Sequence, residues 1–326
     1  MKYCFIINPN AGKGTCIEEL SESIKSSCLE LLAEYDIYVS QSVDNTDEYV
    51  ARSANECGDA GVAFIACGGD GTLCKTVMSV MKLPKEIRKN VFVGVVPSGT
   101  GNDFVSNFNN KHLFLDIKSQ LESTTYAIDL LKCNDMYSVN MINIGFDCHV
   151  VCKKEEIGRR KWLPRKFAYI FSLVITLIKK PGVELKLSTD GIEAQKKSLL
   201  LTTWANGAFC GGGFNSNPKA CLTDGKIDCI TVENVSRVKF LTLVGDYKNG
   251  THLGEKFEGI VDNFKSQTVD MYFDEETPVS VDGEVIRTKE LHISVERDAL
   301  NILLPKNVLP KVERATEVFD KEPVLQ

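Results

Sequence analysis

Three glycine-rich turns contain the residue types with the greatest capacity for chemistry, and each follows a short apolar run. The middle turn, residues 68–72, reads GGDGT. Its glycines let the backbone come close to a large anion, and the amides that start the next helix favour negative charge. A carboxylate beside a phosphate would repel it unless Mg²⁺ lay between the two. The turn therefore predicts a polyphosphate site in which Asp70 acts on the metal, with a simple helix cap as the alternative role for Asp70.

The first turn, residues 8–15 (NPNAGKGT), matches neither common nucleotide-binding loop. Ile7 and Gly14 stand where a Walker loop requires glycine and a hydroxyl residue, and Ile17 stands at the third glycine of a Rossmann loop. We interpret it as a phosphate-binding turn of another kind, to which Asn8 supplies an amide, or as an ordinary strand-to-helix turn. The third turn, residues 97–104 (PSGTGNDF), again places small residues and hydroxyls before a predicted helix.

Alternating strands and helices are expected to position these turns. Apolar runs predict strands at 3–8, 38–42, 61–67 and 91–96, and apolar periodicity predicts helices at 17–35, 45–57 and 73–81. The second helix would begin with a capping box formed by Asn45 and Glu48. This alternation predicts a parallel sheet with helices on both faces. Such sheets bind ligands beyond the carboxyl ends of their strands, where all three turns would meet.

The pattern changes near residue 127, after which short strands with alternating polarity follow one another closely. Turn signals such as Asp190-Gly191 and Asp282-Gly283 lie between them, and one helical segment is expected at about 163–180. We therefore predict an α/β domain at residues 1–127 and a β-rich sandwich at residues 128–301. The tail, residues 302–326, is expected to pack back on the first domain or to fray.

Composition excludes several classes of protein. The net charge of −6, from 44 acidic and 38 basic residues, argues against a general nucleic-acid binder. The 12 cysteines form no CxxC pair, which argues against a zinc finger, and no secretory signal opens the chain, so a cytoplasmic location is expected. The most hydrophobic segment, the 12 residues 167–178, is shorter than the ~20 that a membrane span needs.

The three turns together resemble those of the diacylglycerol kinase catalytic family, and especially its bacterial soluble lipid kinases, which are related to sphingosine kinase. The resemblance rests on NPNAG at 8–12, GGDGT at 68–72 and PSGTGND at 97–103. It continues with NIGFD at 143–147, CGGGFNSNPKACLTDGKID at 210–228 and VDGE at 281–284. The ordered set is specific, although NAD kinases and phosphofructokinases have loops similar to GGDGT. The family implies an α/β nucleotide domain like that of NAD kinase, a β-sandwich domain for the lipid substrate, and a site in the cleft between them.

The resemblance also implies roles for individual residues. It implies ATP with Mg²⁺ as the phosphoryl donor, a hydroxyl of diacylglycerol or a related lipid as the acceptor, and Glu284 as the catalytic base. It implies a structural Mg²⁺ held by Asp224 with the backbone carbonyls of Cys221 and Lys226. The residues that would line the nucleotide are Asn8, Pro9, Asn10, Ala11, Gly12, Ser42, Gly68, Gly69, Asp70, Gly71, Thr72, Lys75, Ser98, Gly99, Thr100, Asn102 and Asp103.

One departure from the family pattern follows GGDGTL, where the family usually has Asn-Glu and this chain has Cys74-Lys75. Lysine reverses the charge of that glutamate, but it could instead contact phosphate directly. Two alternatives stay open. An NAD kinase would share GGDGT and a β-rich second domain, and the Cys74-Lys75 departure suggests a nucleotide- or lipid-binding relative that has lost catalysis. Without the resemblance, the Asp-Gly-Glu sequence that ends in Glu284 would be read as a hairpin turn with solvated acids.

A basic stretch at residues 153–166 (KKEEIGRRKWLPRK) contains seven basic residues, two acidic residues and Trp162. Basic residues beside an aromatic residue and an apolar helix suit an anionic membrane surface, although a solvated turn before a core helix has the same composition. A lipid kinase must reach its substrate at a membrane, so peripheral contact is expected. The family also suggests a homodimer.

Overall fold

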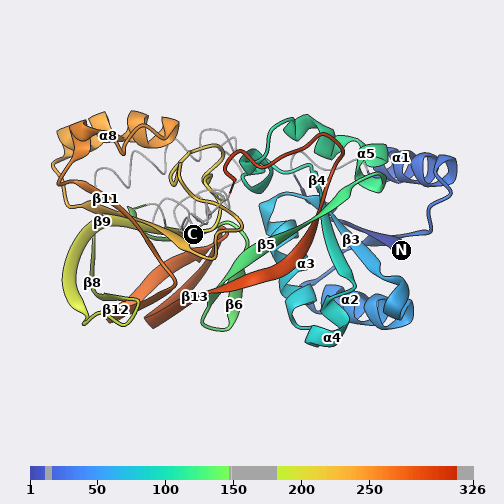
Figure 1. The fold of residues 1–326 in the computed structure, drawn as a ribbon, viewed down its shortest axis with the longest axis horizontal. Coiled ribbons are helices and arrows are strands. Elements are labelled where there is room, and N and C mark those ends of the chain that lie inside the picture. The colour runs from blue at the N-terminus through green and yellow to red at the C-terminus, as the bar shows by residue number, and fades with distance from the viewer. Residues whose placement is uncertain (12–16, 147, 149–181, 314–326) are drawn as a thin grey trace, which may run out of the picture.

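A computed structural model describes residues 1–11, 17–146, 148 and 182–313 (Figure 1). The helix predicted at 163–180 and the basic stretch at 153–166 lie outside the described residues.

The N-terminal half contains four strands that pair in parallel in the order β4-β3-β1-β2. Their carboxyl ends therefore lie at one edge of the sheet, and the three glycine-rich turns follow β1, β3 and β4 there. The elements of this half are β1 (Lys2–Ile7), α1 (Ile17–Glu30), β2 (Tyr35–Val39), α2 (Val43–Cys57), β3 (Val62–Gly68), α3 (Asp70–Met81), α4 (Lys85–Arg88), β4 (Val91–Pro97) and α5 (Ile117–Leu121), with short 3₁₀ helices at Gly58–Ala60, Phe104–Asn107 and Lys111–Leu115.

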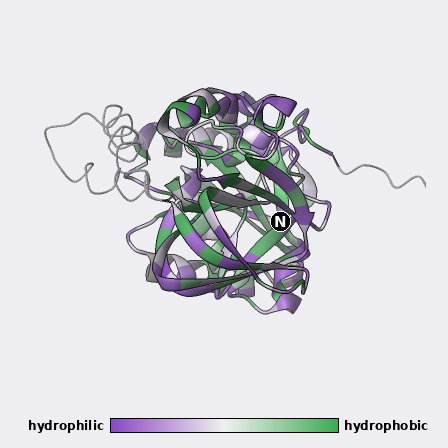
Figure 2. Ribbon diagram, turned by 90° about the vertical axis from the view of Figure 1, so that its left-hand side faces the viewer, coloured by the Kyte–Doolittle hydropathy of each residue, from purple (hydrophilic) through white to green (hydrophobic). Residues whose placement is uncertain are grey.

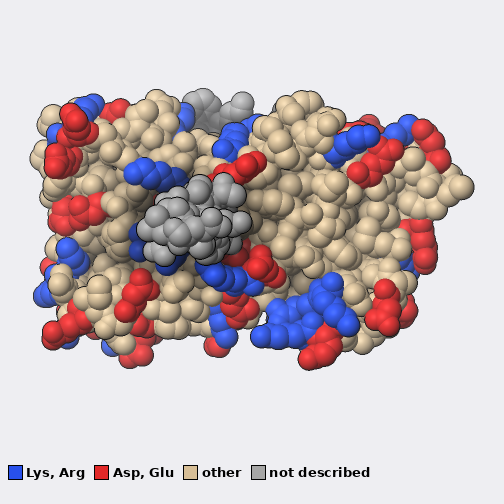
Figure 3. Space-filling view, viewed as in Figure 1, with Lys and Arg blue, Asp and Glu red and all other residues tan. Residues whose placement is uncertain are grey.

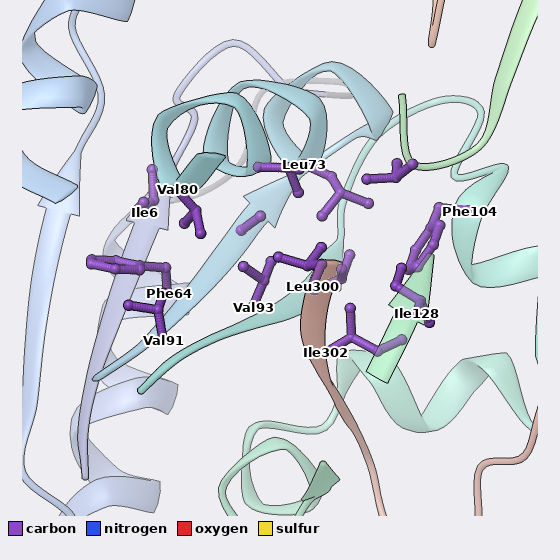
Figure 4. Close-up of a cluster of buried hydrophobic side chains, with 14 of the residues drawn as sticks. Ile6, Phe64, Leu73, Val80, Val91, Val93, Phe104, Ile128, Leu300 and Ile302 are labelled. Carbon is purple, nitrogen blue, oxygen red and sulfur yellow. The ribbon is translucent and has the colours of Figure 1, made fainter. Parts of the chain in front are cut away.

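Helices cover both faces of these strands because successive strand residues point to opposite sides. On one face, Ile6 and Phe64 pack with Leu73 of α3 and with residues of α2 (Figure 4). On the other face, Phe5 and Ile65 pack with residues of α1 and α5. The buried apolar strands thus form the middle layer that supports the turns at its edge.

Several predicted boundaries differ from the structure. Helix α1 ends at Glu30 rather than 35, because Leu32 takes a left-handed conformation with φ 52° and the Ala33 amide bonds back to the Cys28 carbonyl. Because the helix ends early, β2 begins at Tyr35, three residues before the predicted start at 38. Helix α2 begins at Val43 and is capped by Ser42, so the capping box predicted from Asn45 is wrong. The helix predicted after the third turn is only the 3₁₀ turn Phe104–Asn107.

The C-terminal half is built from antiparallel pairs. Strand β12 pairs with both β7 and β8, and β9 pairs with the same two strands, so these four close around a buried cluster that includes Trp204. Hydrophobic and hydrophilic residues both occur along the strands (Figure 2), as in the alternating burial of β8. The elements are β5 (Thr124–Cys133), β6 (Met136–Ser138), β7 (Met141–Gly145), β8 (Val183–Thr189), β9 (Gln195–Ala205), β10 (Ile227–Glu233), α8 (Arg237–Asn249), a 3₁₀ turn at Glu255–Phe257, β11 (Val261–Ser266), β12 (Thr268–Val281) and β13 (Glu284–Leu304).

Strand β13 connects the two halves. It pairs with β12 over its first part, with β5 over its second, and in parallel with β4 at Asn301 and Ile302. Beyond it, Phe108 of the N-terminal half bridges Pro310, and Lys311 and Val312 contact Phe209 and Cys221 of the C-terminal half. Residue 127, the predicted domain boundary, falls inside β5. Of the 13 strand pairs among the described residues, 4 are parallel and 9 antiparallel, so the sheet as a whole is mixed.

No helix within the described ranges is long and apolar enough to span a bilayer. The face seen in Figure 3 carries both signs of charge, with a group of Lys and Arg side chains over α4.

A buried histidine should make the stability of the C-terminal half depend on pH. Burial lowers the pKa of His252 below its usual value, and the backbone of Asp246 and Ser216, together with the Asp246 charge, opposes this only in part. Below about pH 6.5, the unfolded chain binds a proton at this histidine that the folded chain does not, so stability falls as the pH falls. We expect Tm to drop between pH 7.5 and 5.5 and the drop to shrink in His252→Gln. The exposed His112, changed to Gln, is the control, and an equal drop in both variants would contradict the assignment.

Candidate functional site

Hydrogen bonds join the three glycine-rich turns into one cluster. The Asn8 Nδ2 donates to Thr72 Oγ1 at 3.0 Å, which links the first turn to the second. The Ser98 amide donates to the Gly68 carbonyl at 2.8 Å, and the Phe104 amide donates to Asp70 Oδ1 at 3.1 Å, which link the second to the third. Residues from three separate parts of the chain therefore share the carboxyl edge of the parallel strands.

Two glycines allow the second and third turns to touch. A Cβ atom built on Gly99 would lie 2.3 Å from the Cα atom of Gly69, a distance that no real contact allows. A Cβ atom built on Gly71, in the same cluster, would meet nothing within 4 Å. Packing therefore requires glycine at position 99, whereas it leaves room for a side chain at position 71.

Gly99→Ala should therefore destabilise the protein, whereas Gly71→Ala should not. Because backbone rather than a flexible side chain blocks the new methyl group, the two turns must move apart, at a cost of about 1–3 kcal/mol. Chemical denaturation of both variants beside the wild type measures the difference. Equal stability of Gly99→Ala and the wild type would show that the turns are not in contact.

Asp70 begins helix α3 but does not cap it. The cap residue is Gly69, which makes no side-chain bond, and Asp70 Oδ1 instead accepts the Phe104 amide from the third turn. The second oxygen, Oδ2, faces Gly101, where an added Cβ atom would lie only 2.9 Å away. A glycine at 101 keeps a side chain out of this space. A carboxylate oxygen in that position fits the Mg²⁺ that a bound polyphosphate would bring.

The remaining turn residues shape the site. Asn102, with φ 57°, holds the third turn, because its side chain accepts from the Gly99 amide and donates to the Gly99 carbonyl, both at 3.0 Å. Asn8 Oδ1 accepts the Asn10 amide at 2.9 Å, which closes the first turn. Thr100, Gly71 and Asn10 are exposed at this edge. Gly12 lies outside the described residues, and Ser42 makes its hydrogen bonds within the first turn of α2.

Asp103 ties the third turn to the other half of the molecule. Its buried carboxylate accepts the Gly212 amide at 2.9 Å and the Gly213 amide at 2.8 Å. Both glycines lie in the turn after β9, and both have positive φ. Asp103 was predicted to line the nucleotide. In the structure it fixes how the third turn meets the C-terminal half.

The predicted base, Glu284, lies across from the glycine-rich cluster. It follows a tight turn in which Asp282 and Gly283 have φ of 48° and 90°, and its Oε1 lies 3.7 Å from Nζ of Lys75 in the first turns of α3. Both side chains are about half exposed. Lys75 therefore spans the space between the half that carries the turns and the half that carries the acid.

Asp282 fixes this acid-bearing turn, a role that sequence reasoning missed. Its carboxylate accepts four hydrogen bonds from the segment between the end of β6 and the start of β7, donated by the Ser138 hydroxyl and the amides of Val139, Asn140 and Met141. Burial raises the pKa of Asp282 to about 6, and the hydrogen bonds oppose that rise. An aspartate before a glycine was the only local signal, and it is equally typical of ordinary hairpins.

Cys74, the first residue of the departure from the family pattern, is a buried packing residue. Burial raises the pKa of its thiol well above the ordinary value, and the charges of Asp282, Glu284 and Asp70 raise it further. The thiol is therefore neutral near pH 7 and unsuited to act as a nucleophile.

The second predicted metal site does not fit a divalent cation as its residues lie. Asp224 Oδ2 contacts Nζ of Lys265 at 2.6 Å, and Asp224 Oδ1 accepts the Lys226 amide at 3.0 Å. Both carboxylate oxygens therefore already have partners. Among the described residues, no group of three or more His, Cys, Asp or Glu side chains could hold a metal.

Two cavities lie apart from the glycine-rich cluster. One of about 90 Å³ lies beside Phe209, Leu222 and Lys311, and one of about 240 Å³ lies beside Leu187 and Phe264. Neither is lined by a residue predicted to bind the nucleotide or the metal.

Comparison with known proteins gives the same two-part organisation. Residues 2–133 match the diacylglycerol kinase catalytic domain, and residues 140–304 match the YegS C-terminal NAD kinase beta sandwich-like domain. A protein of Staphylococcus epidermidis named "Putative lipid kinase" is 28% identical over 291 residues, which cover 88% of this chain and 90% of that protein. A Staphylococcus aureus protein of the same name is 25% identical over 300 residues, which cover 91% of this chain and 92% of that protein.

Solved structures share the fold. A crystal structure titled as a putative diacylglycerol kinase from Bacillus anthracis superposes with a TM-score of 0.73 at 20% identity, and the match covers 94% of this chain and 98% of the other. Another Bacillus anthracis structure of that description gives 0.70 at 21% identity, with 94% and 97% covered. At these identities the likeness concerns the fold alone, an N-terminal domain followed by a β-sandwich.

Proposed function

We propose that this protein transfers the γ-phosphoryl group of ATP to a hydroxyl of diacylglycerol or a related lipid. The chain belongs to the family that joins a diacylglycerol kinase catalytic domain to a YegS-like β-sandwich domain. It is therefore a phosphotransferase with an alcohol acceptor. The observation that carries this proposal is the meeting of three phosphate-compatible turns with an acid from the other half.

Phosphoryl transfer requires positioned phosphates, a clamp for developing charge, and a group that orients the attacking hydroxyl. The turns at 8–11, 68–72 and 97–103 supply small residues for the phosphates, and Asn10, Gly71 and Thr100 are exposed there. The parallel edge beneath them is the ligand-binding edge of open α/β sheets. These features support a nucleotide site made by the N-terminal half.

Glu284 is proposed as the base that accepts the proton of the lipid hydroxyl. The hydroxyl oxygen then forms a bond to the γ-phosphorus while the bond between that phosphorus and the β–γ bridging oxygen breaks, so ADP leaves. Lys75, 3.7 Å from Glu284, can orient the carboxylate and contact a phosphate oxygen from the same position. Asp70 would hold a Mg²⁺ whose charge offsets that of the phosphates.

Three expectations remain predictions. They are contact of the stretch at 153–166 with a membrane surface, a cytoplasmic location, and a homodimer. The first follows from the proposed acceptor, because diacylglycerol is embedded in a bilayer. Binding to vesicles with and without anionic lipid measures it directly.

A transfer assay with ATP labelled at the γ-phosphate tests the proposal. Mixed micelles would each contain one acceptor from a panel of diacylglycerol, sphingosine, monoacylglycerol and ceramide, with NAD as a separate acceptor and GTP as a second donor. We expect label in a lipid. Label in NAD alone would establish an NAD kinase, and ATP binding without transfer to any acceptor would establish a non-catalytic relative.

A further inference from the structure

We propose that the ammonium group of Lys265 is a built-in cation of the C-terminal half, in the place where the family resemblance implies a structural Mg²⁺. Lys265 lies on β11, and its Nζ contacts Asp224 Oδ2 at 2.6 Å and the Lys219 carbonyl oxygen at 3.4 Å. A carboxylate oxygen and a backbone carbonyl are the ligands that a hard divalent cation takes in proteins. Of the donor set that the resemblance implies, which is Asp224 with the carbonyls of Cys221 and Lys226, the lysine therefore occupies the Asp224 carboxylate oxygen.

The rest of the turn around Asp224 is also occupied. Asp224 Oδ1 accepts the Lys226 amide at 3.0 Å, and the Asp224 carbonyl accepts from Arg297 at 3.3 Å. Arg297 packs so closely on Gly225 that an added Cβ atom would lie 1.9 Å from its Nε. A second cationic group thus borders the turn. A divalent cation entering there would meet two positive side chains at short range, where charges interact strongly.

The charges of the surrounding residues explain why a cation is required. Asp228 on β10 is opposite Lys265 in the antiparallel register and is 2% exposed, so the two side chains are neighbours on one face of the pair. Asp129, 1% exposed, accepts the Gly225 amide at 2.6 Å and the Asp298 amide at 2.9 Å. Three carboxylates, those of Asp129, Asp224 and Asp228, therefore gather around a turn in which Asp224 contacts Lys265 and Arg297.

Partial burial strengthens the attraction between Asp224 and Lys265. The Asp224 side chain is only 16% exposed and that of Lys265 38%, so water screens the pair less than it would screen an open surface pair. The turn is also bound to β5, because the Asp129 amide on that strand donates to the Leu222 carbonyl at 2.8 Å. An ammonium in this position stabilises the turn without a metal, and it confines the Mg²⁺ requirement of the protein to the nucleotide.

Thermal unfolding without nucleotide or lipid tests the proposal. Tm is measured in excess MgCl₂, and in EDTA with KCl added to the same ionic strength. We expect the wild type to unfold at the same temperature in both. A rise of the wild-type Tm with Mg²⁺ that Asp224→Asn abolishes would overturn the proposal.

Variants of the lysine make the test two-sided. Lys265→Met keeps the aliphatic stem and removes the charge, so we expect its Tm in EDTA to fall by about 2–4 °C and Mg²⁺ to restore part of the loss. Lys265→Arg keeps the charge and should remain insensitive to Mg²⁺, which provides a readout if the methionine variant does not fold. Lys256→Met is the matched control, since Lys256 pairs with Asp246 at 2.8 Å in the same half and no metal is implied there.

A Lys265→Met variant as stable in EDTA as the wild type would also overturn the proposal. The readout needs neither ATP nor a lipid acceptor, so its failure is distinguishable from failure of the proposed kinase activity.

Discussion

Glu284→Gln should lower kcat for transfer to the lipid by about 10²–10⁴-fold, the range expected for loss of a general base. Glutamine has the same shape and can stay beside Lys75, but it cannot accept the hydroxyl proton. The turn should remain folded, because its four anchoring hydrogen bonds belong to Asp282. The affinity for ATP should therefore stay close to that of the wild type.

The measurement is a steady-state transfer assay paired with calorimetric titration of ATP. Glu290→Gln is the control, because Glu290 is an exposed acid on the same strand, β13. Normal turnover in Glu284→Gln would show that Glu284 is only a solvated acid in a hairpin, the alternative interpretation of this turn.

Asp70→Asn should lower kcat/KM by about 10²–10³-fold, the size expected when a fixed electrostatic partner of the transition state is lost. Asparagine keeps an oxygen that can accept the Phe104 amide, so the link between the second and third turns should persist. The loss should therefore come from weaker binding of Mg²⁺ with the nucleotide rather than from unfolding.

Two measurements distinguish weaker Mg²⁺ binding from unfolding. They are Tm and the Mg²⁺ concentration that gives the half-maximal rate. Asp59→Asn is a suitable control, because this exposed aspartate precedes β3 at the opposite end of the strand from Asp70. Near-normal activity of Asp70→Asn at low Mg²⁺ would refute the role given to the carboxylate, and a large fall in Tm would show that its role is structural.

The convergence of the glycine-rich turns could be predicted because local patterns determine it. Alternating strands and helices place the ends of β1, β3 and β4 at one edge, and glycine composition marks the close contact of Gly69 with Gly99. The role of Glu284 as the catalytic base was predicted from the resemblance to known motifs, because no local pattern near the turns indicates it.

The contacts that could not be predicted all join distant parts of the chain. Asp103 looked like one more phosphate-turn residue, yet its partners are amides 109 and 110 positions away. Lys265 lies 41 positions after Asp224, and nothing in the alternation of β11 marks it as the partner of that acid. The sequence also did not predict that β13 pairs with β12 over its first part and with β5 over its second. The alternation of polar and apolar residues indicates which face of a strand is buried, but not which strand lies beside it.

The central claim is that residues of three separate turns bind one nucleotide at one edge of the parallel strands. Amide hydrogen exchange, measured by mass spectrometry with and without Mg-ATP, tests it most directly. We predict slower exchange in peptides covering residues 8–11, 68–75 and 97–104, and unchanged exchange at 58–61 and 88–91, at the opposite ends of β3 and β4. Protection at those opposite ends, or at only one of the three turns, would contradict the account.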